Sequence, residues 1–277
     1  MDSQYLRSLF GLEGQVAVLT GGGGILCGTM SRAFARLGAR VAVLDMNLQA
    51  AQSVADSIVA EGHQAIAVQA NVLETQDLQA ALQQILERFG HVDILVNGAG
   101  GNKKEATTSP DLSFFDLPKD AFQWVFNLNF LGTLLCTQVF GQQMARQDSG
   151  TILNIASVNS FRPLTNIPAY SAAKAAVVNL TQWMAVHMSL HYSKHIRVNA
   201  LAPGFFLTEQ NRFLLSDGET GELTKRGQTI LDHTPQARFG EPEELVGAAV
   251  WLVSPSAAFV HGSVVTVDGG FMAFSGV

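Results

Sequence analysis

The stretch Gln15-Val16-Ala17-Val18-Leu19-Thr20-Gly21-Gly22-Gly23-Gly24-Ile25-Leu26-Cys27-Gly28 decides the fold of this chain. Its first six residues are a mostly apolar run of strand length, and the glycines after it predict a tight turn into a helix. Glycines let a backbone approach a pyrophosphate closely, and the first amides of a helix offer the positive end of its dipole. The stretch therefore predicts a strand, a phosphate-binding turn and a helix. A flexible turn that binds nothing is the alternative for the glycines alone.

Short apolar runs alternate with helical patterns along the rest of the chain, and amphipathic segments such as Leu48–Glu61 and Thr75–Phe89 separate them. This alternation specifies right-handed βαβ units and a parallel sheet. We therefore predict an α/β protein with a single-domain Rossmann fold over residues 1–277, in which helices cover both faces of a doubly wound, seven-stranded parallel sheet. The predicted strands are Val16–Thr20, Val41–Asp45, Ala65–Ala70, Val92–Asn97, Thr151–Ser157, Arg197–Ala200 and Val264–Asp268.

Asp45 ends the second predicted strand, and an acidic residue about 20 positions beyond such glycines holds the hydroxyl groups of an adenosine ribose. The carboxylate also repels a 2′-phosphate, and no arginine follows it directly. The sequence therefore predicts NAD as the cofactor in preference to NADP.

Tyr170 and Lys174 predict proton-transfer chemistry, because residues four apart on a helix share a face. We expect the Lys174 charge to lower the pKa of Tyr170, since a free tyrosine, with a pKa of about 10, is a poor base at neutral pH. Ser157 ends a predicted strand upstream and is expected to hydrogen-bond the reacting oxygen, a role for which Ser160 is the competitor. The set predicts an oxidoreductase that moves a proton.

The composition excludes several classes of protein. The 277 residues carry 17 basic and 23 acidic side chains, a formal net charge of −6, and 47% of them are hydrophobic. The chain has enough apolar material for one large core, and it has no basic run that would bind nucleic acid. No segment has the length and apolarity of a membrane span or a leader, and two cysteines fit a reducing compartment. We expect a cytoplasmic protein without a membrane anchor. We assign no metal site, neither to Cys27 and Cys136 nor to the histidines at 187, 191 and 195.

From about Leu12 to the C-terminus, the chain resembles the short-chain dehydrogenase/reductase family. Thr20-Gly21 and the residues after it resemble the family's Thr-Gly-x-x-x-Gly-x-Gly turn, and Asn97-Gly98-Ala99-Gly100 resembles its Asn-Asn-Ala-Gly motif. Ser157, Tyr170 and Lys174 match its catalytic residues, with Asn129 as the fourth, and Pro203-Gly204-Phe205-Phe206-Leu207-Thr208 resembles the segment that embraces a nicotinamide.

The chain departs from the family pattern at four positions. Ile25 and Cys27 stand where the family has glycines, Gly98 replaces the second asparagine of the Asn-Asn-Ala-Gly motif, and Asn71 replaces the acidic residue near adenine. These departures leave the cofactor prediction in place and concern only its individual contacts.

The resemblance implies a hydride transfer between a nicotinamide and a secondary alcohol or ketone. It implies that Tyr170 exchanges the proton, Ser157 stabilises the reacting oxygen, Lys174 holds the ribose, and Asn129 holds a water that links Lys174 to solvent. It also implies a homotetramer or homodimer built through the long helices, and a small helical lid at about 208–235 that closes over the substrate. The residues expected to bind the cofactor are Gly21, Gly24, Ile25, Leu26, Asp45, Asn71, Val72, Asn97, Ala99, Tyr170, Lys174, Pro203, Gly204, Phe206 and Thr208.

Two segments, residues 97–108 and 267–277, are similar to sugar-acid oxidoreductases of the fructuronate reductase (D-mannonate oxidoreductase) type. A sugar acid needs a cation for its carboxylate and polar groups for its hydroxyls. We therefore expect Asn102, Lys103, Ser157 and Arg162 to bind the substrate, with Lys104 nearby. A family member that acts on gluconate, a polyol or a 3-oxoacyl thioester is an alternative. A non-catalytic NAD sensor on the same fold is another, although a sensor has no need of all four catalytic residues.

Overall fold

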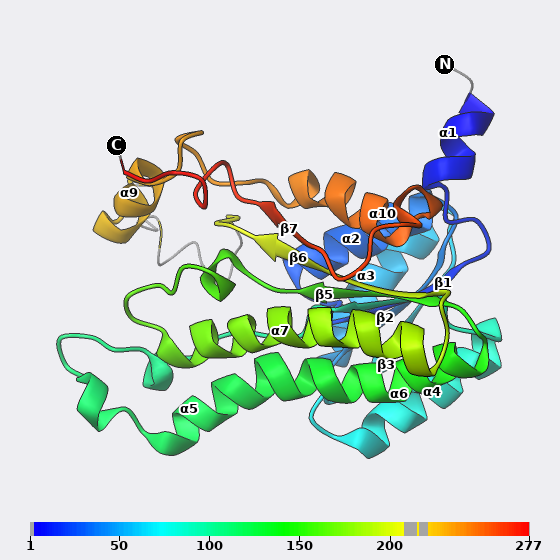
Figure 1. Ribbon diagram of the computed structural model, residues 1–277, viewed down its shortest axis with the longest axis horizontal. Coiled ribbons are helices and arrows are strands. Elements are labelled where there is room, and N and C mark those ends of the chain that lie inside the picture. Colours follow the sequence, from blue (N-terminus) through cyan, green and yellow to red (C-terminus); the bar gives the residue numbers. More distant parts are fainter. Residues whose placement is uncertain (1–2, 208–214, 216–220, 277) are drawn as a thin grey trace.

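The computed structural model describes residues 3–207, 215 and 221–276, and these residues form one seven-stranded sheet in the order β3-β2-β1-β4-β5-β6-β7 (Figure 1). Every neighbouring pair of strands is parallel. The chain leaves β1 in one direction to build β2 and β3, then returns to the other side of β1 with β4, which is the topology of a doubly wound sheet. The strands are β1 Val16–Thr20, β2 Arg40–Asp45, β3 Ala65–Gln69, β4 Ile94–Asn97, β5 Gly150–Ile155, β6 Ile196–Pro203 and β7 Val264–Val267.

Helices cover both faces of the sheet (Figure 1). One face packs against α2 (Ile25–Arg36), α3 (Leu48–Ala60) and α10 (Val246–Val253), and the other packs against α4 (Thr75–Phe89), α6 (Gly132–Arg146) and α7 (Pro168–His191). The predicted fold class is confirmed. The remaining elements are α1 Ser3–Phe10, α5 Lys119–Phe126, α9 Lys225–Asp232, a π-helical turn η3 Asn127–Leu131, and the 3₁₀ turns η1 Lys104–Ala106, η2 Phe114–Asp116, η4 Val158–Ser160, η5 Pro242–Leu245 and η6 Pro255–Ala257.

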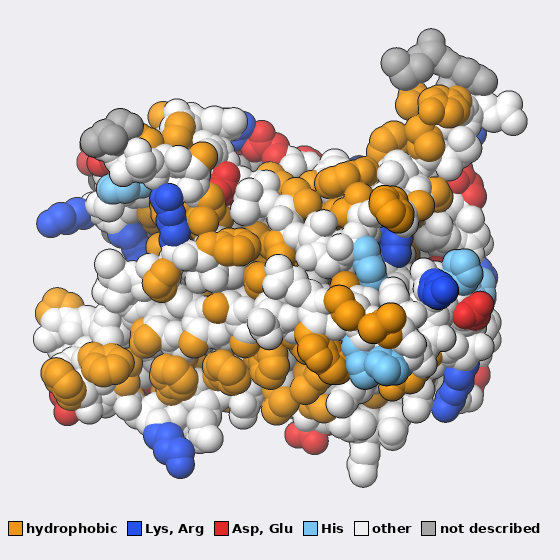
Figure 2. Space-filling model, viewed as in Figure 1, with side chains coloured by type: hydrophobic (Ala, Val, Ile, Leu, Met, Phe, Trp, Pro, Cys, Tyr) orange, Lys and Arg blue, Asp and Glu red, His pale blue; other side chains and the backbone are white. Residues whose placement is uncertain are grey.

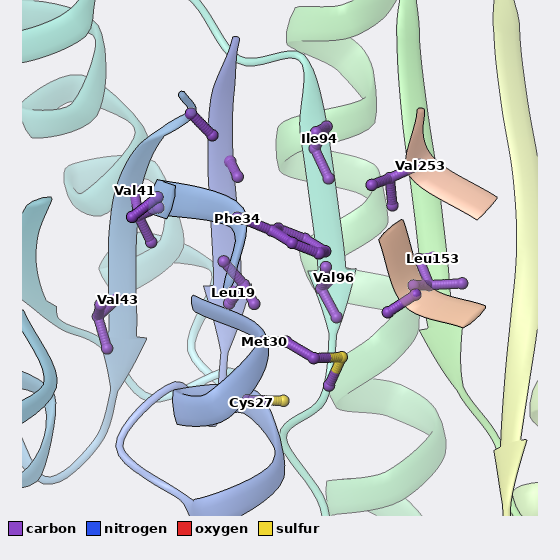
Figure 3. Packing of buried hydrophobic residues seen from close by; sticks show 14 of the residues in the cluster. Leu19, Cys27, Met30, Phe34, Val41, Val43, Ile94, Val96, Leu153 and Val253 are labelled. Atoms are coloured by element: carbon purple, nitrogen blue, oxygen red, sulfur yellow. The ribbon is translucent and has the colours of Figure 1, made fainter. Parts of the chain in front are cut away.

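The central strands are buried on both faces, which explains their nearly continuous apolar sequences. In β1, Leu19 belongs to the core under α2, while Val18 belongs to the core under α4 and α6. Figure 3 shows Met30 and Phe34 of α2 extending across the sheet toward Val96 of β4. This packing fixes α2, and with it the glycine turn before α2, against the sheet.

All seven predicted strands occur; Val16–Thr20 matches at both ends, and the ends of the others shift by at most three residues. The strand predicted to end at Ser157 ends at Ile155, because the Ser157 hydroxyl accepts a hydrogen bond from the Asn159 amide at 3.2 Å and caps η4. No described helix is long and apolar enough to cross a membrane. The predicted lid at 208–235 lies partly outside the described residues, since only residues 215 and 221–235 of it are described, among them α9.

The carboxyl ends of all seven parallel strands lie at one edge of the sheet, the left-hand end in Figure 1, and five of them carry predicted site residues. Strands β1, β2, β4, β5 and β6 end there at Thr20, Asp45, Asn97, Ile155 and Pro203. Ligands of doubly wound sheets bind outside this edge, beside the strand where the winding reverses. The fold therefore gathers the residues predicted from widely separated motifs.

We predict that Phe34→Ala lowers the free energy of unfolding by about 3–5 kcal/mol, because it removes a large buried ring from a packed core. Phe34 is 0% exposed. Urea unfolding measures the change, and Phe115→Ala is the matched control, since Phe115 is 92% exposed and its loss should cost less than about 0.5 kcal/mol. Equal effects of the two substitutions would contradict the packing described.

Candidate active site

The turn after β1 brings its backbone against the loop that follows β4. Gly21 has a φ of 62°, and a Cβ atom there would lie 2.9 Å from the Cα of Ala99, so only glycine fits this position. Gly24 precedes α2 without a side-chain cap, so the amides of Ile25 and Leu26 have no acceptor within the helix. The turn thus presents free backbone donors at a helix N-terminus, an arrangement that fits a pyrophosphate.

Asp45 ties this turn to the end of β2. Its carboxylate accepts hydrogen bonds from the amides of Gly23, at 3.1 Å, and Asn47, at 2.9 Å. The Gly22 amide donates to the carbonyl oxygen of Leu44 at 3.0 Å. Asp45 is partly exposed beside the turn, so its carboxylate lies within reach of a molecule bound there.

Cys27 and Gly98 are two of the departures from the family pattern, and the structure brings them together. A Cβ atom at Gly98 would lie 2.1 Å from the Cys27 Sγ, so a side chain at position 98 and the thiol at position 27 exclude each other. The thiol is buried, which raises its pKa to about 12. Cys27 therefore fills the space that Gly98 leaves empty, and each departure compensates for the other.

Asn97 directs its side chain into the core. Its Nδ2 donates to the Oγ1 of Thr137 and to the Oδ1 of Asn154, both at 2.9 Å. The Asn154 amide in turn donates to the Thr181 hydroxyl at 2.8 Å. The side chain thus joins β4 and β5 to α6 and α7, which leaves only backbone groups of Asn97 for any contact with a cofactor.

Asn71 and Val72 follow β3 beside the turn. The Asn71 side-chain oxygen accepts a hydrogen bond from the Leu73 amide at 3.1 Å, and the Asn71 amide donates to Asp77 at 3.0 Å. Val72 is buried against α6, where a Cβ at Gly132 would meet its Cγ2 at 2.9 Å. These hydrogen bonds fix the segment after β3 to the first turn of α4, at the same edge of the sheet as the glycine turn.

The Pro-Gly segment follows β6 at this edge. The Gly204 amide donates to the carbonyl oxygen of Val267 at 2.9 Å, and a Cβ at Gly204 would lie 2.7 Å from the Cα of Asp268. The Phe206 ring is buried, so it lies in the core beneath the crevice. Thr208, also predicted to bind the cofactor, lies outside the described residues.

Tyr170, Ser157 and Lys174 come together where α7 crosses the end of β5. The Tyr170 hydroxyl lies near enough to Ser157 for this serine to lower the Tyr170 pKa, and the Lys174 Nζ lies 5.7 Å from the centroid of the Tyr170 ring. Lys174 Nζ donates to the carbonyl oxygen of Ile155 at 2.7 Å. Ser160, the competitor of Ser157, donates instead to the Lys174 carbonyl oxygen at 2.9 Å and so supports the helix.

Asn129 lies on the π-helical turn η3 between α5 and α6. Its Nδ2 donates to the carbonyl oxygens of Val125, at 2.8 Å, and Gly101, at 2.7 Å, and its Oδ1 accepts from the Gly101 amide at 3.1 Å. A Cβ at Gly100 would meet both the Asn129 Oδ1, at 2.5 Å, and the Lys174 Nζ, at 3.4 Å. A side chain at position 100 would therefore meet both groups, and glycine leaves room for the amide and the ammonium to lie close together.

Burial perturbs the acid–base properties of both groups on α7. The pKa of Tyr170 is raised by burial, and the Ser157 hydrogen bond lowers it only in part, so the expected lowering by Lys174 is not found in the free protein. Burial also lowers the pKa of Lys174 to about 8. The expected lowering of the Tyr170 pKa rested only on the shared helical face. Burial removes water from both groups and disfavours the charged form of each, and this effect was not considered.

The residues expected to bind the substrate lie on two loops at this edge. The Asn102 amide donates to the Thr107 hydroxyl at 2.8 Å, and the Lys103 Nζ lies 4.9 Å from the centroid of the Trp124 ring. Arg162 Nη1 donates to the carbonyl oxygens of Phe271, at 3.3 Å, and Phe274, at 2.8 Å. Lys104 begins the turn η1 and is exposed.

Sequence reasoning missed two features of this site. It did not foresee that Asn159, buried beside Ser157, has a side-chain oxygen without a hydrogen-bond partner among the described residues. It also did not foresee that residues 268–276 fold back to Arg162. Backbone carbonyl acceptors leave no signature in a sequence, so the contacts of Arg162 could not have been found there.

The comparisons with known proteins agree with this geometry. The sequence model described as short chain dehydrogenase matches residues 15–218, so the chain belongs to the short-chain dehydrogenase family, whose members are NAD(P)-dependent oxidoreductases. The chain is 46% identical over 275 residues to the uncharacterized oxidoreductase UxuB of Bacillus subtilis, covering 96% of this chain and 98% of that protein.

Solved structures extend the comparison. A Haemophilus influenza protein with bound NAD, provisionally described as a D-mannonate oxidoreductase, superposes with a TM-score of 0.91 at 46% identity, over 98% of this chain and 100% of that one. A gluconate 5-dehydrogenase of Burkholderia cenocepacia, in complex with NADP and tartrate, superposes with a TM-score of 0.85 at 32% identity, over 97% of this chain and 99% of that one. The predicted family is confirmed.

We predict that Gly98→Ala destabilises the protein by about 1–3 kcal/mol, because the new methyl group overlaps the Cys27 thiol. Adding Cys27→Gly to the same chain should restore most of the loss, since it removes the overlapping atom. Urea unfolding of both single variants and the double variant gives the coupling energy. Gly101→Ala is the control, because no atom lies within 4 Å of a Cβ there. If the changes in the free energy of unfolding of the two single variants simply add in the double variant, Cys27 and Gly98 do not compensate for each other.

A second prediction concerns NADH binding and pH. The charged form of Lys174 is the better donor to a bound ribose, and in the free protein it is lost as the pH rises through about 8. NADH affinity should therefore fall about tenfold between pH 7 and 9, with proton uptake on binding in that range. Isothermal titration in buffers of different ionisation enthalpy measures both quantities. The Lys174→Met variant should bind NADH more weakly, with little dependence on pH. An NADH affinity of the unaltered protein that does not change between pH 7 and 9 would contradict this role of Lys174.

Proposed function

We propose that this chain is an NAD-dependent dehydrogenase that interconverts a secondary alcohol and a ketone of a sugar acid, of the D-mannonate and D-fructuronate type. The observation that carries the proposal is the position of the Tyr170 hydroxyl, next to Ser157 and one helical turn from the buried ammonium of Lys174. A partly buried phenol beside a buried ammonium can exchange a proton with an alcohol oxygen. Likeness to the Haemophilus protein supports the substrate class.

In this mechanism, Tyr170 accepts the hydroxyl proton of the alcohol, or donates it to the ketone in the reverse direction. Ser157 donates a hydrogen bond to the same oxygen and stabilises the charge that develops there. NAD, when bound, supplies the hydride acceptor, and its reduced form supplies the hydride donor. Because burial raises the Tyr170 pKa in the free protein, the phenolate needs the positive charge of Lys174 close by.

Lys174 and Asn129 provide the remaining functions. Lys174 Nζ is fixed by the Ile155 carbonyl oxygen, and its other donors are available to a ribose and to a water. The Asn129 Oδ1 and this ammonium both lie where a Cβ of Gly100 would project, at 2.5 and 3.4 Å from it, and this closeness supports a water-linked path for the proton. Asn129 is thus a positioning residue, because its own hydrogen bonds hold the loop at Gly101.

NAD is favoured over NADP by the charge of Asp45. The carboxylate is partly exposed beside the turn and fits the two hydroxyls of an adenosine ribose, whereas a 2′-phosphate would meet a negative charge. The five residues that follow, 46–50, contain no lysine or arginine to bind such a phosphate. Since one solved relative binds NAD and another binds NADP, the choice depends on this local chemistry.

The predicted cofactor contacts fall into two kinds. Backbone groups of Gly21, Gly24, Ile25 and Leu26 face the pyrophosphate, and backbone groups of Asn97, Ala99, Pro203, Gly204 and Phe206 line the rest of the crevice, since the side chains of Asn97 and Phe206 are buried elsewhere. Asn71 and Val72 are proposed to border the adenine, and Thr208 stays a prediction from the sequence.

We also propose that the protein works as a dimer or tetramer built through α6 and α7. Trp183, Val186 and Leu190 are 57%, 60% and 72% exposed on α7. Figure 2 shows apolar side chains and histidines gathered over these helices, and an uncharged face of this kind suits contact with a second copy.

Three further predictions from the sequence are kept as proposals. They are the cytoplasmic location, the single-domain organisation and the role of residues 208–235 as a lid.

The experiment that tests this function measures nicotinamide absorbance with the purified protein, using D-mannonate, D-fructuronate, D-gluconate and neutral polyols, each with NAD(H) and NADP(H). We expect selective turnover of the mannonate and fructuronate pair with NAD(H). Tyr170→Phe should keep NADH binding and lose at least about 10³-fold in kcat, because the proton-transferring hydroxyl is gone. Turnover of gluconate or polyols alone would favour the alternative substrates, and NADH binding without turnover of any of them would favour the sensor.

A further inference from the structure

We propose that the C-terminal tail, residues 268–276, aims Arg162 at the carboxylate of the substrate. This inference rests on the proposed sugar-acid function and adds a recognition device to it. Arg162 follows η4 on the loop that carries Ser157, and the tail passes over this loop beside α9 (Figure 1). Arg162 can bind a carboxylate in this way only if the tail is held in place and leaves some donors of Arg162 available.

The tail is a folded turn and not a loose end. The Asp268 carboxylate accepts hydrogen bonds from the amides of Gly270 and Met272, both at 2.9 Å. Gly269 and Gly270 have φ values of 63° and 90°, which other residues rarely adopt, so these two glycines let the chain reverse. The Phe274 amide closes the turn on the Gly270 carbonyl oxygen at 3.1 Å.

The tail is also docked on two neighbouring segments. The Gln236 amide donates to the Gly269 carbonyl oxygen at 3.2 Å, just beyond α9. The Phe271 ring packs edge-on against Phe205 of the Pro-Gly segment, with 5.1 Å between the ring centroids. The carbonyl groups of Phe271 and Phe274 are therefore fixed relative to the wall of the crevice.

These two carbonyl groups orient the guanidinium of Arg162. Both accept hydrogen bonds from the same nitrogen, Nη1, at 3.3 and 2.8 Å. A guanidinium has five N–H donors in a rigid plane, so two acceptors on Nη1 leave the edge formed by Nε and Nη2. Over the described ranges, no carboxylate pairs with Arg162 and no acceptor occupies that edge.

The Nε and Nη2 edge matches a carboxylate with two parallel hydrogen bonds, which is the strongest recognition that arginine offers. Because carbonyl groups and not a carboxylate hold the other edge, the positive charge stays uncompensated until an anion binds. Arg162 lies five residues beyond Ser157, so it suits a carboxylate some carbons away from the reacting oxygen of a sugar acid. The tail acts on the substrate only through Arg162 and is a positioning element.

The test compares Arg162→Gln, a chain that ends at Gly270, and the combination of the two, in steady-state reduction of D-fructuronate by NADH. Each single change should raise KM about 10- to 100-fold while kcat changes less than about threefold, since the lost contact is to a group remote from the reaction. NADH affinity should not change. The combination should be no worse than Arg162→Gln alone, because the tail has no other route to the substrate. Arg88→Gln on α4, a helix outside both the site and the proposed interface, is the control and should behave as the unaltered protein.

Three results would overturn the proposal. The first is a KM for D-fructuronate that does not change in either single variant. The second is an increase in KM in the combination that equals the product of the two single increases, and the third is an equal fall in kcat and NADH affinity. If the shortened chain does not fold, Phe271→Ala replaces it, because it removes the ring contact that docks the tail and leaves the chain length intact. Absence of turnover of any sugar acid by the unaltered protein would refute the proposed function and this inference together. Turnover with KM unchanged in the variants would refute the inference alone.

Discussion

The buried ammonium of Lys174 is the constraint on which the site depends. A charge shielded from water needs oxygen acceptors, and the nearest one is the Ile155 carbonyl oxygen at the end of β5, at 2.7 Å. This bond, together with the one that the Ser160 hydroxyl of η4 donates to the Lys174 carbonyl oxygen, fixes the first turns of α7 to the end of β5. Tyr170 is one helical turn earlier and therefore meets Ser157. The same burial that lowers the Lys174 pKa makes its charge sensitive to whatever binds beside it.

The parallel sheet explains why motifs spread over the whole chain act together. All seven strands end at one edge, so the glycine turn, Asp45, Ser157 and the Pro-Gly segment face a single crevice. One departure from the family pattern can compensate for another in the same place. The Cys27 thiol occupies the space that a side chain at position 98 would need, and Gly98 has no side chain. A family site can therefore keep its chemistry while the packing below it changes.

Much of this arrangement was predictable from the sequence, because strand and helix periodicities and the Tyr170–Lys174 spacing are local signals. The seven strands and the edge where the motifs meet follow from them. The end of β5 at Ile155 was not predictable, since a serine hydroxyl competed with the sheet for the backbone. The direction of the Tyr170 pKa was also wrong, because burial depends on the whole fold and not on one helical face. The hold of the tail on Arg162 involves carbonyl oxygens that every residue possesses, so no pattern of side chains signals it.

The most direct test of the account is a crystal structure of the protein with NADH and a bound sugar acid. We predict that the pyrophosphate binds at the amides of Ile25 and Leu26 and that the ribose hydroxyls contact Asp45. The reacting oxygen of the sugar acid should lie within hydrogen-bond distance of both Tyr170 and Ser157. A dinucleotide bound elsewhere, or a substrate oxygen out of reach of the Tyr170 hydroxyl, would contradict it.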